Sequence, residues 1–582
     1  MKRLHFRSGL QFAPRTTRAA WLALMLLAWA RVPAEVMPPT PVGNLPEKPM
    51  VAQFSDGTLA GVLLQREGTQ QFIAARFSSD NGDTWTSASR LFEIPEAEGL
   101  VEGYMIMIDR GDNFHCFYLN NPNKKPAAPG GEAERPHVGA LGQPRLDIWH
   151  AVSSDRGATW TTPRCIWEGY TGALNSIIQL KSGRILVPFS LLTDRSWWNR
   201  DDGPFNFSFN GQYDCTLVYS DDDGATWHES PARLSVVVPD IVSAYGAVEP
   251  VVLELKDGRV WMLIRTQMGR FYESFSEDGV EWSAPRPTQI VSSDSPAGLV
   301  RLTDGRIVLF WNKCQRFPYA YGGRHVLHAA ISDDEGRTWR GHREVARDPL
   351  NDQPPPAGGD FGTAYPFPIA TLDGKAIYYT GQGEGRVDVM RLDPDWLLER
   401  SAVADYSTGL TEWSTFGTKG VSIETGSSDA PDKHLKITRP DADWAAGAVW
   451  NFPLGARGEL TFDLLLPEGS RGATILLADH FSPPFDAEDE FYSLFNLNIG
   501  ADGTVGNSQL THGNWHTLRM NWDVARRECV VQVDGQEAAV LPLRHEAQGV
   551  CYIRFKTAGD DPDPAGLRVG PVKATLAADD RP

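Results

Sequence analysis

The sequence predicts an all-β protein with a six-bladed β-propeller over residues 40–400, followed by a β-sandwich jelly roll over residues 405–577. Two interleaved repeats in the first region carry the prediction, together with alternating strand patterns that lack those repeats in the second. The composition agrees, because 41% hydrophobic and 22% charged residues in a chain of 582 are typical of soluble globular proteins. It excludes a disordered, a collagen-like and a coiled-coil chain.

Residues 1–34 have the pattern of an export signal. A basic stretch precedes the apolar run 19–30, and small alanines at or just after its end suit a cleavage site. We therefore expect a signal peptide and a secreted or periplasmic protein, with an uncleaved single-helix anchor as the alternative. Removing the six basic residues of this segment changes the formal net charge from −19 to −25, which argues against nucleic acid or anionic lipid as a partner.

An octapeptide with the pattern Ser-x-Asp-x-Gly-x-Thr-Trp predicts tight turns between strands. Asp and Ser side chains bond main-chain groups in such turns, Gly permits a positive φ, and Trp packs beneath. These aspartates are therefore expected to be structural rather than catalytic. The four intact copies and one copy that is a residue short are at Ser78–Trp85, Ser153–Trp160, Ser220–Trp227, Ser332–Trp339 and Ser276–Trp282.

A second repeat predicts six β-hairpins, each formed by two apolar stretches around a turn that ends in Gly. Five hairpins are followed by a second hairpin that turns on the octapeptide, which gives blades of four antiparallel strands. The sixth blade has no octapeptide, and we expect its outer strand to come from the N-terminal end of the propeller. The six hairpin turns are Asp56-Gly57, Arg110-Gly111, Ser182-Gly183, Asp257-Gly258, Asp304-Gly305 and Asp373-Gly374.

The C-terminal region shows strand alternation at 460–465, 515–520 and 530–535. Its Gly-x-Trp-His strand, followed by Val-Asp-Gly, resembles a concanavalin-type or laminin-G-like domain. Such a domain implies carbohydrate binding, whereas a structural cap on the propeller is the equally weighted alternative. The six cysteines are too sparse for a disulfide scaffold, and no CxxC spacing indicates zinc. We predict no metal and no cofactor, and the sequence leaves the oligomeric state open.

Blade topology brings four chemically useful residues to one face of the predicted propeller. Each of them starts a strand, or ends its partner strand, eight residues away from a turn on the opposite face. Two of them, Glu249 and Arg265, flank the same hairpin and are expected to lie side by side. The other two are Arg324, eight residues before Ser332, and Tyr365, eight residues before Asp373.

With these residues in place, the chain resembles the sialidase superfamily of BNR-repeat proteins over about residues 40–400. The octapeptides are similar to the Asp-boxes of that family. The stretch from Glu249 to Arg265 resembles the family segment that holds the catalytic Glu and an arginine. Gly323-Arg324 resembles a second arginine segment, and Ala364-Tyr365 resembles the segment of the nucleophilic tyrosine.

The resemblance implies a retaining exo-sialidase that removes terminal sialic acid from a glycan or glycoconjugate. Tyr365 would attack the anomeric carbon while Glu249 accepts its proton, since a phenol needs such a base. Arg265 and Arg324 would bind the sugar carboxylate through paired N–H donors. The alternative for each arginine is an ordinary ion pair with a neighbouring acid at the rim.

Two segments depart from the family pattern. Glu47-Lys48-Pro49 stands where the family usually has Arg-Ile-Pro, and an acid at that position would oppose a sugar carboxylate. Lys48 is the only other cation there, but neighbouring side chains on a strand face opposite sides. The family also places an Asp shortly before the first Asp-box, where this chain offers only Arg66-Glu67, so Glu67 is one candidate for the general acid.

The loop 193–202 supplies the other candidates for that acid, Asp194 and Asp201. Its Trp197 and Trp198 either stack on a sugar ring or pack at the rim. Two other functions stay open beside the sialidase. One is a non-catalytic glycan-binding propeller, and the other is a hydrolase or lyase of the same fold that acts on another polysaccharide.

Overall fold

The computed structural model describes residues 36–578 with gaps. The signal-peptide prediction for residues 1–34 therefore lies outside the described residues. The gaps are residues 44, 46, 96–98, 125–144, 194–212, 238–245, 315–322, 349–361, 382–387, 416–418, 427–430, 444–446 and 484–488.

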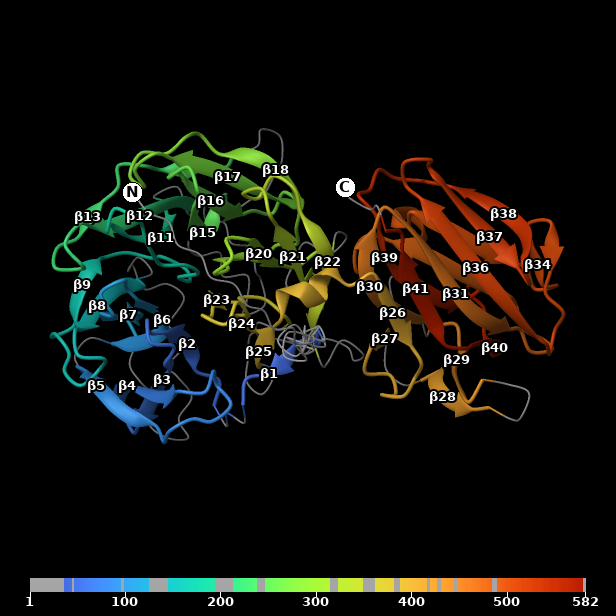
Figure 1. Ribbon diagram of the computed structural model, residues 1–582, viewed down its shortest axis with the longest axis horizontal. Helices are drawn as coiled ribbons and strands as arrows, with labels where there is room; N and C mark the ends of the chain where they lie inside the picture. The colour runs from blue at the N-terminus through green and yellow to red at the C-terminus, as the bar shows by residue number, and fades with distance from the viewer. Residues whose placement is uncertain are drawn as a thin grey trace, which may run out of the picture. The chain divides into compact units, whose positions relative to one another are not determined.

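The propeller consists of six antiparallel sheets, which follow one another around a common centre (Figure 1). The first blade contains β2 (Met50–Gln53), β3 (Leu59–Glu67), β4 (Gln70–Ser78) and β5 (Ser89–Ile94). The second contains β6 (Leu100–Ile108), β7 (Phe114–Asn121), β8 (Asp147–Ser153) and β9 (Arg164–Trp167). The third contains β10 (Ile178–Gln179), β11 (Ile185–Leu192), β12 (Tyr213–Ser220), β13 (His228–Glu229) and β14 (Leu234–Ser235).

The remaining blades follow the same plan. The fourth contains β15 (Val248–Glu254), β16 (Val260–Arg265), β17 (Arg270–Ser276) and β18 (Arg286–Val291). The fifth contains β19 (Gly298–Arg301), β20 (Ile307–Trp311), β21 (Val326–Ser332) and β22 (Arg340–Arg347). The sixth contains β23 (Ile369–Ala370), β24 (Ala376–Tyr379), β25 (Val389–Leu392) and β1 (Thr40–Pro41).

The ring closes through its N-terminal strand, as the sequence predicts. Thr40 and Pro41 pair with Arg391 and Met390, so β1 is the outer strand of the sixth blade. The inner strands β2 and β23 also contact each other, which joins the first blade to the last. Buried apolar side chains fill the space between blades; one such cluster contains Phe117 of the second blade and Phe189 of the third.

The octapeptides form the predicted turns. In the first copy, the Ser78 hydroxyl donates to Asp80 Oδ1 at 2.8 Å and accepts the Gly82 N–H at 2.8 Å. Asp80 Oδ1 in turn accepts the Thr84 N–H at 2.9 Å. The indole of Trp85 donates to the Gly82 carbonyl at 2.9 Å. These bonds engage the Asp carboxylate within its own turn, which is the structural role expected of it.

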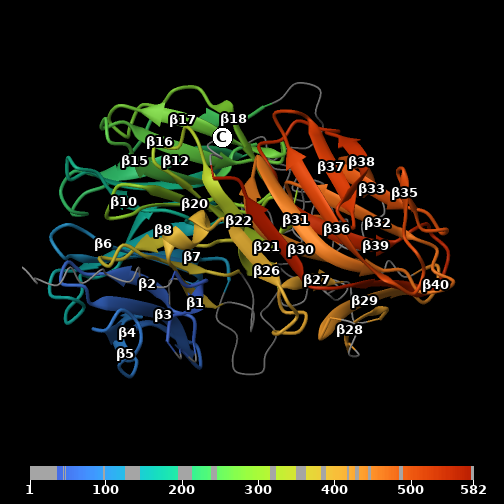
Figure 2. The same cartoon turned by 45° about the vertical axis from the view of Figure 1, so that its right-hand side comes forward.

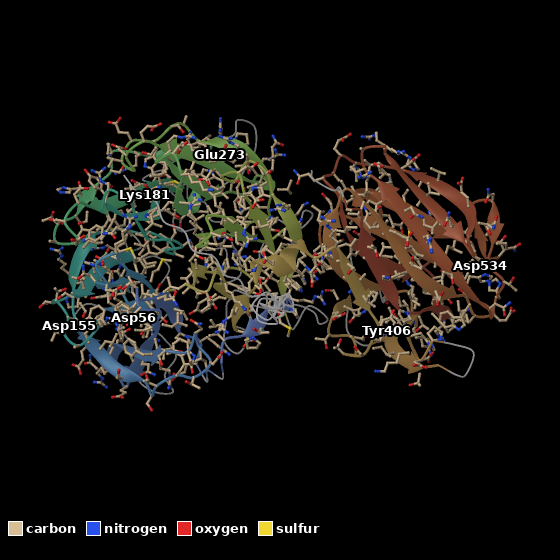
Figure 3. The ribbon with its side chains drawn as sticks, in the orientation of Figure 1. Asp56, Asp155, Lys181, Glu273, Tyr406 and Asp534 are labelled. Atoms are coloured by element: carbon tan, nitrogen blue, oxygen red, sulfur yellow. The ribbon has the colours of Figure 1, made fainter. Side chains whose placement is uncertain are left out.

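Turns from neighbouring blades meet on the octapeptide face. Arg156, in the second octapeptide, donates to Asp56 of the first-blade hairpin at 2.6 Å. It also pairs with Asp112 of the second-blade hairpin at 3.0 Å. Figure 3 labels Asp56 of the first-blade hairpin turn and Asp155 of the second octapeptide. The two kinds of turn therefore share one face, which leaves the opposite face for the starts of the inner strands.

The C-terminal region is a sandwich of two larger antiparallel sheets (Figure 2). One sheet contains β26 (Ser401–Ala404), β28 (Val421–Thr425), β29 (Lys433–Arg439), β31 (Arg457–Leu465), β36 (Trp515–Asp523), β37 (Glu528–Val533), β38 (Gln536–Pro542), β40 (Asp563–Val569) and β41 (Val572–Leu576). The other contains β27 (Trp413–Thr415), β30 (Gly447–Gly455), β32 (Ala473–Ala478), β33 (Phe495–Ile499) and β39 (Val550–Thr557). The small hairpin β34 (Thr504–Val505) and β35 (Ser508–Gln509) is separate.

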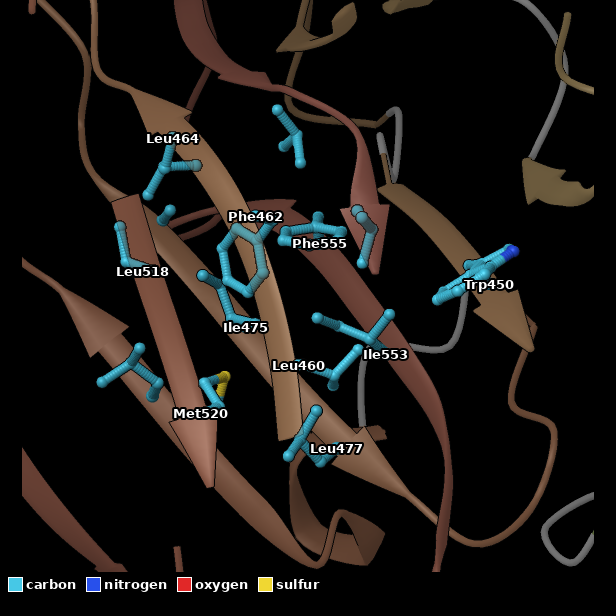
Figure 4. Close-up of a cluster of buried hydrophobic side chains, with 14 of the residues drawn as sticks. Trp450, Leu460, Phe462, Leu464, Ile475, Leu477, Leu518, Met520, Ile553 and Phe555 are labelled. Carbon is cyan, nitrogen blue, oxygen red and sulfur yellow. The ribbon is translucent and has the colours of Figure 1, made fainter. Parts of the chain in front are cut away.

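The sandwich core explains the alternating pattern of its strands. Alternate residues of β31 and β36 are buried and face alternate residues of β32 and β39. Phe462 and Phe555 meet edge to face, with ring centres 5.1 Å apart. Figure 4 shows this core, in which Trp450, Leu460, Phe462, Leu464, Ile475, Leu477, Leu518, Met520, Ile553 and Phe555 are labelled.

Propeller and sandwich share polar contacts within one compact unit, Pro38–Pro582. Lys313, just after β20, pairs with Asp479 of the sandwich at 3.0 Å. Tyr552 of β39 donates to Glu344 of β22 at 2.7 Å and lies 2.6 Å from His328 Nε2. These buried groups satisfy one another across the contact. All six cysteines are unpaired thiols.

Candidate active site

Four residues singled out from the sequence lie together in the structure. Tyr365 Oη donates to Glu249 Oε1 at 2.7 Å. Arg265 Nη1 donates to the other oxygen of Glu249, and it also donates to Tyr365 Oη at 3.3 Å. The guanidinium carbon of Arg324 lies 5.5 Å from the centre of the Tyr365 ring. The cluster joins a phenol, a carboxylate and two guanidinium groups that come from the fourth, fifth and sixth blades.

A bulge at the start of β15 places the Glu249 side chain. Val248 pairs with Arg265, but the register shifts before Val251, so two residues leave the regular ladder. Glu249 has a φ of 48° in this bulge. Its main-chain N–H donates to Ser190 Oγ of the neighbouring blade at 2.7 Å. The bulge thus turns the carboxylate toward Tyr365, although the sequence pattern alone predicts an uninterrupted strand.

Tyr365 also has a left-handed backbone. Its φ is 62°, and Phe367 two residues later has a φ of 37°. The sequence predicts that Tyr365 starts the inner strand of the sixth blade, but β23 begins only at Ile369. Pro366 and Pro368 explain the difference, because proline has no N–H to donate to a strand ladder.

Two of the functional candidates carry backbone strain, and Phe367 shares it. Glu249 and Tyr365 each precede a proline, and the residue before a proline favours an extended backbone with negative φ. A non-glycine residue in the left-handed region costs on the order of 1–3 kcal/mol. Such strain persists when surrounding contacts hold the side chain in place, and it is concentrated at active sites.

The site is buried, and its charges balance. Tyr365 is 7% exposed and Glu249 8% exposed. Burial raises the pKa of the Tyr365 phenol well above its ordinary value; the charge of Glu249 adds to the rise, and both arginines oppose it. The phenol is therefore neutral at physiological pH, and it can act as a nucleophile only if a base removes its proton.

One member of the cluster was missed by the sequence reasoning. Asp294 lies in the link between β18 and β19 and pairs with Arg265 Nε at 2.7 Å. Its main-chain carbonyl accepts a hydrogen bond from Arg324 at 3.2 Å. A usable signal was present, because the end of an outer strand and the start of the next inner strand also lie on the active face. The two carboxylates and two guanidinium groups give the cluster a formal charge of zero.

The altered first-blade segment does not supply a third arginine. Glu47 accepts hydrogen bonds from Arg76 at 3.0 Å and from Gln65 at 3.1 Å, both in its own blade. Lys48 pairs with Asp388 of the sixth blade at 2.8 Å. The carboxylate of Glu47 therefore does not oppose the arginine pair directly, and the ammonium of Lys48 is engaged by an acid at the rim.

The structure describes only one of the residues predicted as general acid or as stacking partner of the sugar. Glu67 ends β3, is exposed, and pairs with Arg90 of β5 at 2.8 Å. Among the described residues, no hydrogen bond or ion pair joins Glu67 to Tyr365. Asp194, Trp197, Trp198 and Asp201 lie outside the described residues. Within the described part of the chain, no group of three or more His, Cys, Asp or Glu side chains could hold a metal ion.

Comparison with known proteins identifies similar chains. The BNR repeat-like domain family matches residues 136–378. The sialidase of Micromonospora viridifaciens is 25% identical over 343 residues, which are 53% of this chain and 45% of that protein. The chain thus spans less than half the length of the curated relative it matches.

Similar solved structures include a protein of unknown function from Dyadobacter fermentans. It is 17% identical, has a TM-score of 0.43, and the match covers 61% of this chain and 97% of that chain. A Trypanosoma rangeli sialidase in complex with the inhibitor DANA is 14% identical with a TM-score of 0.39, over 93% of this chain and 92% of that chain.

Proposed function

Because the chain belongs to the sialidase superfamily of BNR-repeat proteins, we propose that it is a retaining glycoside hydrolase. Its proposed substrate is a glycan or glycoconjugate that ends in sialic acid or a related sugar with a carboxylate. The proposal is supported by one observation above all: the Tyr365 phenol donates its hydrogen to Glu249 at 2.7 Å in a buried setting. Sialidases with a tyrosine nucleophile are an exception to the usual two-carboxylate scheme.

In the first step, Tyr365 Oη attacks the anomeric carbon while Glu249 takes the phenolic proton. The bond between the anomeric carbon and the leaving oxygen breaks, and that oxygen receives a proton from a general acid. The product is a glycosyl–tyrosine intermediate. A neutral phenol suits an anionic sugar, because a carboxylate nucleophile would be repelled by the carboxylate next to the anomeric carbon.

In the second step, water attacks the anomeric carbon from the face that the leaving group occupied. The bond to Tyr365 Oη breaks, and the phenolate recovers the proton from Glu249. The general acid of the first step now accepts a proton from water. Two inversions give net retention at the anomeric carbon. Glu67 and the loop residues Asp194 and Asp201 are the proposed sources of this acid.

Arg265 and Arg324 are the proposed carboxylate-binding residues. Guanidinium groups present paired N–H donors that match the two oxygens of a carboxylate, and they keep their charge at all physiological pH values. Both flank the Tyr365 phenol, with Arg265 within hydrogen-bonding distance of it. Trp197 and Trp198 are proposed to stack on the bound sugar.

The first blade favours a second candidate substrate. Glu47 and Lys48 are both engaged by other side chains, so the site offers an anion the two guanidinium groups of Arg265 and Arg324 and no third cation from this segment. A site with fewer cations fits an acidic sugar other than sialic acid, processed by the same tyrosine.

We also propose export of the protein. Within the described residues, no helix is long and apolar enough to cross a membrane.

The decisive experiment measures release of 4-methylumbelliferone from its α-sialoside. Wild-type protein is expected to turn the substrate over, and Tyr365→Phe is expected to lower kcat by about a thousandfold or more, since removing the nucleophile of a covalent mechanism costs this much. Tyr378→Phe is the matched control, because Tyr378 is also buried in the sixth blade but donates to the Val345 carbonyl. Its activity should match that of the wild type.

Three other results would each point elsewhere. Hydrolysis that survives Tyr365→Phe would remove the assigned nucleophile. A wild type that leaves the sialoside intact but hydrolyses the corresponding glucuronide would favour the second candidate substrate. A wild type that is inert on every glycoside yet binds acidic glycans on an array would show a non-catalytic glycan-binding propeller.

A further inference from the structure

We propose that Asp294 is a positioning residue that holds Arg265 and Arg324 as one rigid pair beside the nucleophile. The inference deepens the proposed function and rests on it in one respect, namely that the arginine pair binds the substrate carboxylate. Asp294 itself does not touch the substrate and acts only through the arginines.

Asp294 engages both arginines with different atoms. Its Oδ1 accepts from Arg265 Nε at 2.7 Å, and its main-chain carbonyl accepts from Arg324 Nη2 at 3.2 Å. Its Oδ2 accepts from Gln267 Nε2 at 3.4 Å. The residue is 4% exposed, so water does not compete strongly for these bonds. A single buried residue therefore couples the positions of two guanidinium groups that belong to different blades.

The bond to Nε decides which edge of Arg265 faces the nucleophile. A guanidinium is planar, and an anchor at the Nε edge leaves Nη1 on the side that faces away from the anchor. In the structure, Nη1 then reaches both Glu249 and the Tyr365 phenol. Without the anchor, Arg265 is free to turn and form a two-pronged ion pair with Glu249, which would occupy the base and remove donors from the substrate.

The segment that carries Asp294 is itself fixed by a buried amide. Asn312 has no exposed surface, and its Oδ1 accepts from the hydroxyl of Ser295 at 2.6 Å. Its main-chain carbonyl accepts from the Ser293 N–H at 2.9 Å. The residues on either side of Asp294 are therefore both bonded to Asn312.

The same amide reaches the other catalytic segments. Asn312 Nδ2 donates to the Val326 carbonyl at 2.7 Å, two residues after Arg324. It also donates to the Thr363 carbonyl at 2.9 Å, two residues before Tyr365. Thr363 N–H in turn donates to the Arg324 carbonyl at 2.7 Å. Buried hydrogen-bond networks favour one geometry, so these bonds hold the segments of the arginines and the tyrosine in a common register.

A crystal structure of Asp294→Ala tests the positional claim without any assay of activity. The expected result is a rotated Arg265 guanidinium that no longer donates to Tyr365 Oη. An unmoved guanidinium would overturn the proposal. If Asp294→Ala does not fold, Asp294→Leu gives the same test, since it fills a similar space but removes both acceptor oxygens.

Kinetics on the 4-methylumbelliferyl sialoside test the consequence. Asp294→Ala is expected to raise KM about tenfold or more, because a charge-assisted hydrogen bond that orients the anion-binding group is lost. Added formate should restore much of the loss, which a merely structural defect would not show. Asp304→Ala is the matched control: Asp304 also accepts from an arginine Nε, that of Arg306 at 2.6 Å, but at a hairpin turn on the octapeptide face.

The outcomes separate the two proposals. A wild type without activity, together with a displaced Arg265 in Asp294→Ala, would contradict the proposed activity and support the positioning role. An active wild type whose KM is unchanged by Asp294→Ala would support the activity and overturn the positioning role. Equal losses in Asp294→Ala and Asp304→Ala, with no effect of formate, would also overturn it.

Discussion

Glu249 and Tyr365 show how single residues at this site depart from local preference. Both precede a proline and both have a positive φ, at 48° and 62°. The hydrogen bond between them spans 116 residues of sequence. Local sequence favours an extended backbone at each position, so the observed conformations must be held by distant contacts such as that of the Glu249 N–H with Ser190.

At the residue scale, we predict that Arg265→Lys weakens recognition of an acidic sugar. Arg265 uses Nε for Asp294 and Nη1 for Glu249 and Tyr365, and a lysine ammonium cannot reach both sides from one atom. The expected cost is about 1–3 kcal/mol, seen as a higher KM for the sialoside. An unaltered KM would contradict the carboxylate-binding role.

The sequence located part of the site and missed part of it. Counting eight residues back from a hairpin turn placed Glu249, Arg324 and Tyr365 on one face, because strand length and alternation fix where a strand starts. Asp294 was missed, because it lies in a link between blades, where only the topology of outer and inner strands, and not a count from a turn, indicates the active face. The ion pair between Glu47 and Arg76 could not be predicted either, because a side-chain pair within one blade has no sequence pattern of its own.

At the element scale, the octapeptide turn is defined almost completely by its own residues. Ser, Asp, Gly, Thr and Trp bond one another within eight positions, as the second copy repeats: Ser153 binds Asp155, and Asp155 binds Thr159. Short-range hydrogen bonds of this kind need no distant partner. The turns and the strands around them are therefore the part of the fold that sequence predicts best.

We predict that Gly336→Ala in the fourth intact octapeptide destabilises the propeller by about 2–4 kcal/mol. Gly336 has a φ of 79°, and a Cβ there would lie 2.9 Å from Trp261 of the neighbouring blade. Thermal and urea unfolding of the variant would show the loss. Gly258→Ala is the control, because its φ is 93° but an added Cβ meets open space.

The control separates strain from packing. Gly258→Ala should cost only about 1 kcal/mol, which is the left-handed backbone penalty alone. The difference between the two variants measures the contact between the turn and the Trp261 ring. Equal losses would show that this interblade contact contributes nothing to stability.

At the scale of the whole molecule, buried tyrosines make the fold sensitive to alkali. Burial raises the pKa of Tyr104, Tyr365, Tyr378 and Tyr406 well above the ordinary value for a phenol. Below pH of about 10 both folded and unfolded chains keep these protons, so the stability is fully present. Above it the unfolded chain releases protons first, and the free energy of unfolding falls as pH rises.

We therefore predict a Tm that is level near pH 8 and falls increasingly above a pH of about 10. Differential scanning calorimetry at several pH values would show the fall, and absorbance of phenolate would appear together with unfolding. Tyr378→Phe removes one buried phenol and should make the fall less steep. A Tm that stays constant across this range would contradict the prediction.

The sequence by itself determined the six blades, the two kinds of turn, the closure of the ring by the N-terminal strand, and the shared face of the catalytic candidates. These features follow from short motifs and from the period of β-strands, so a few neighbouring residues specify each one. Only the tertiary structure decided that Glu249 lies in a bulge, that Glu47 is paired within its blade, and that Asp294 joins the two arginines. Each of these depends on side chains that are far apart in sequence, and their contacts exist only once the blades have packed around a common centre.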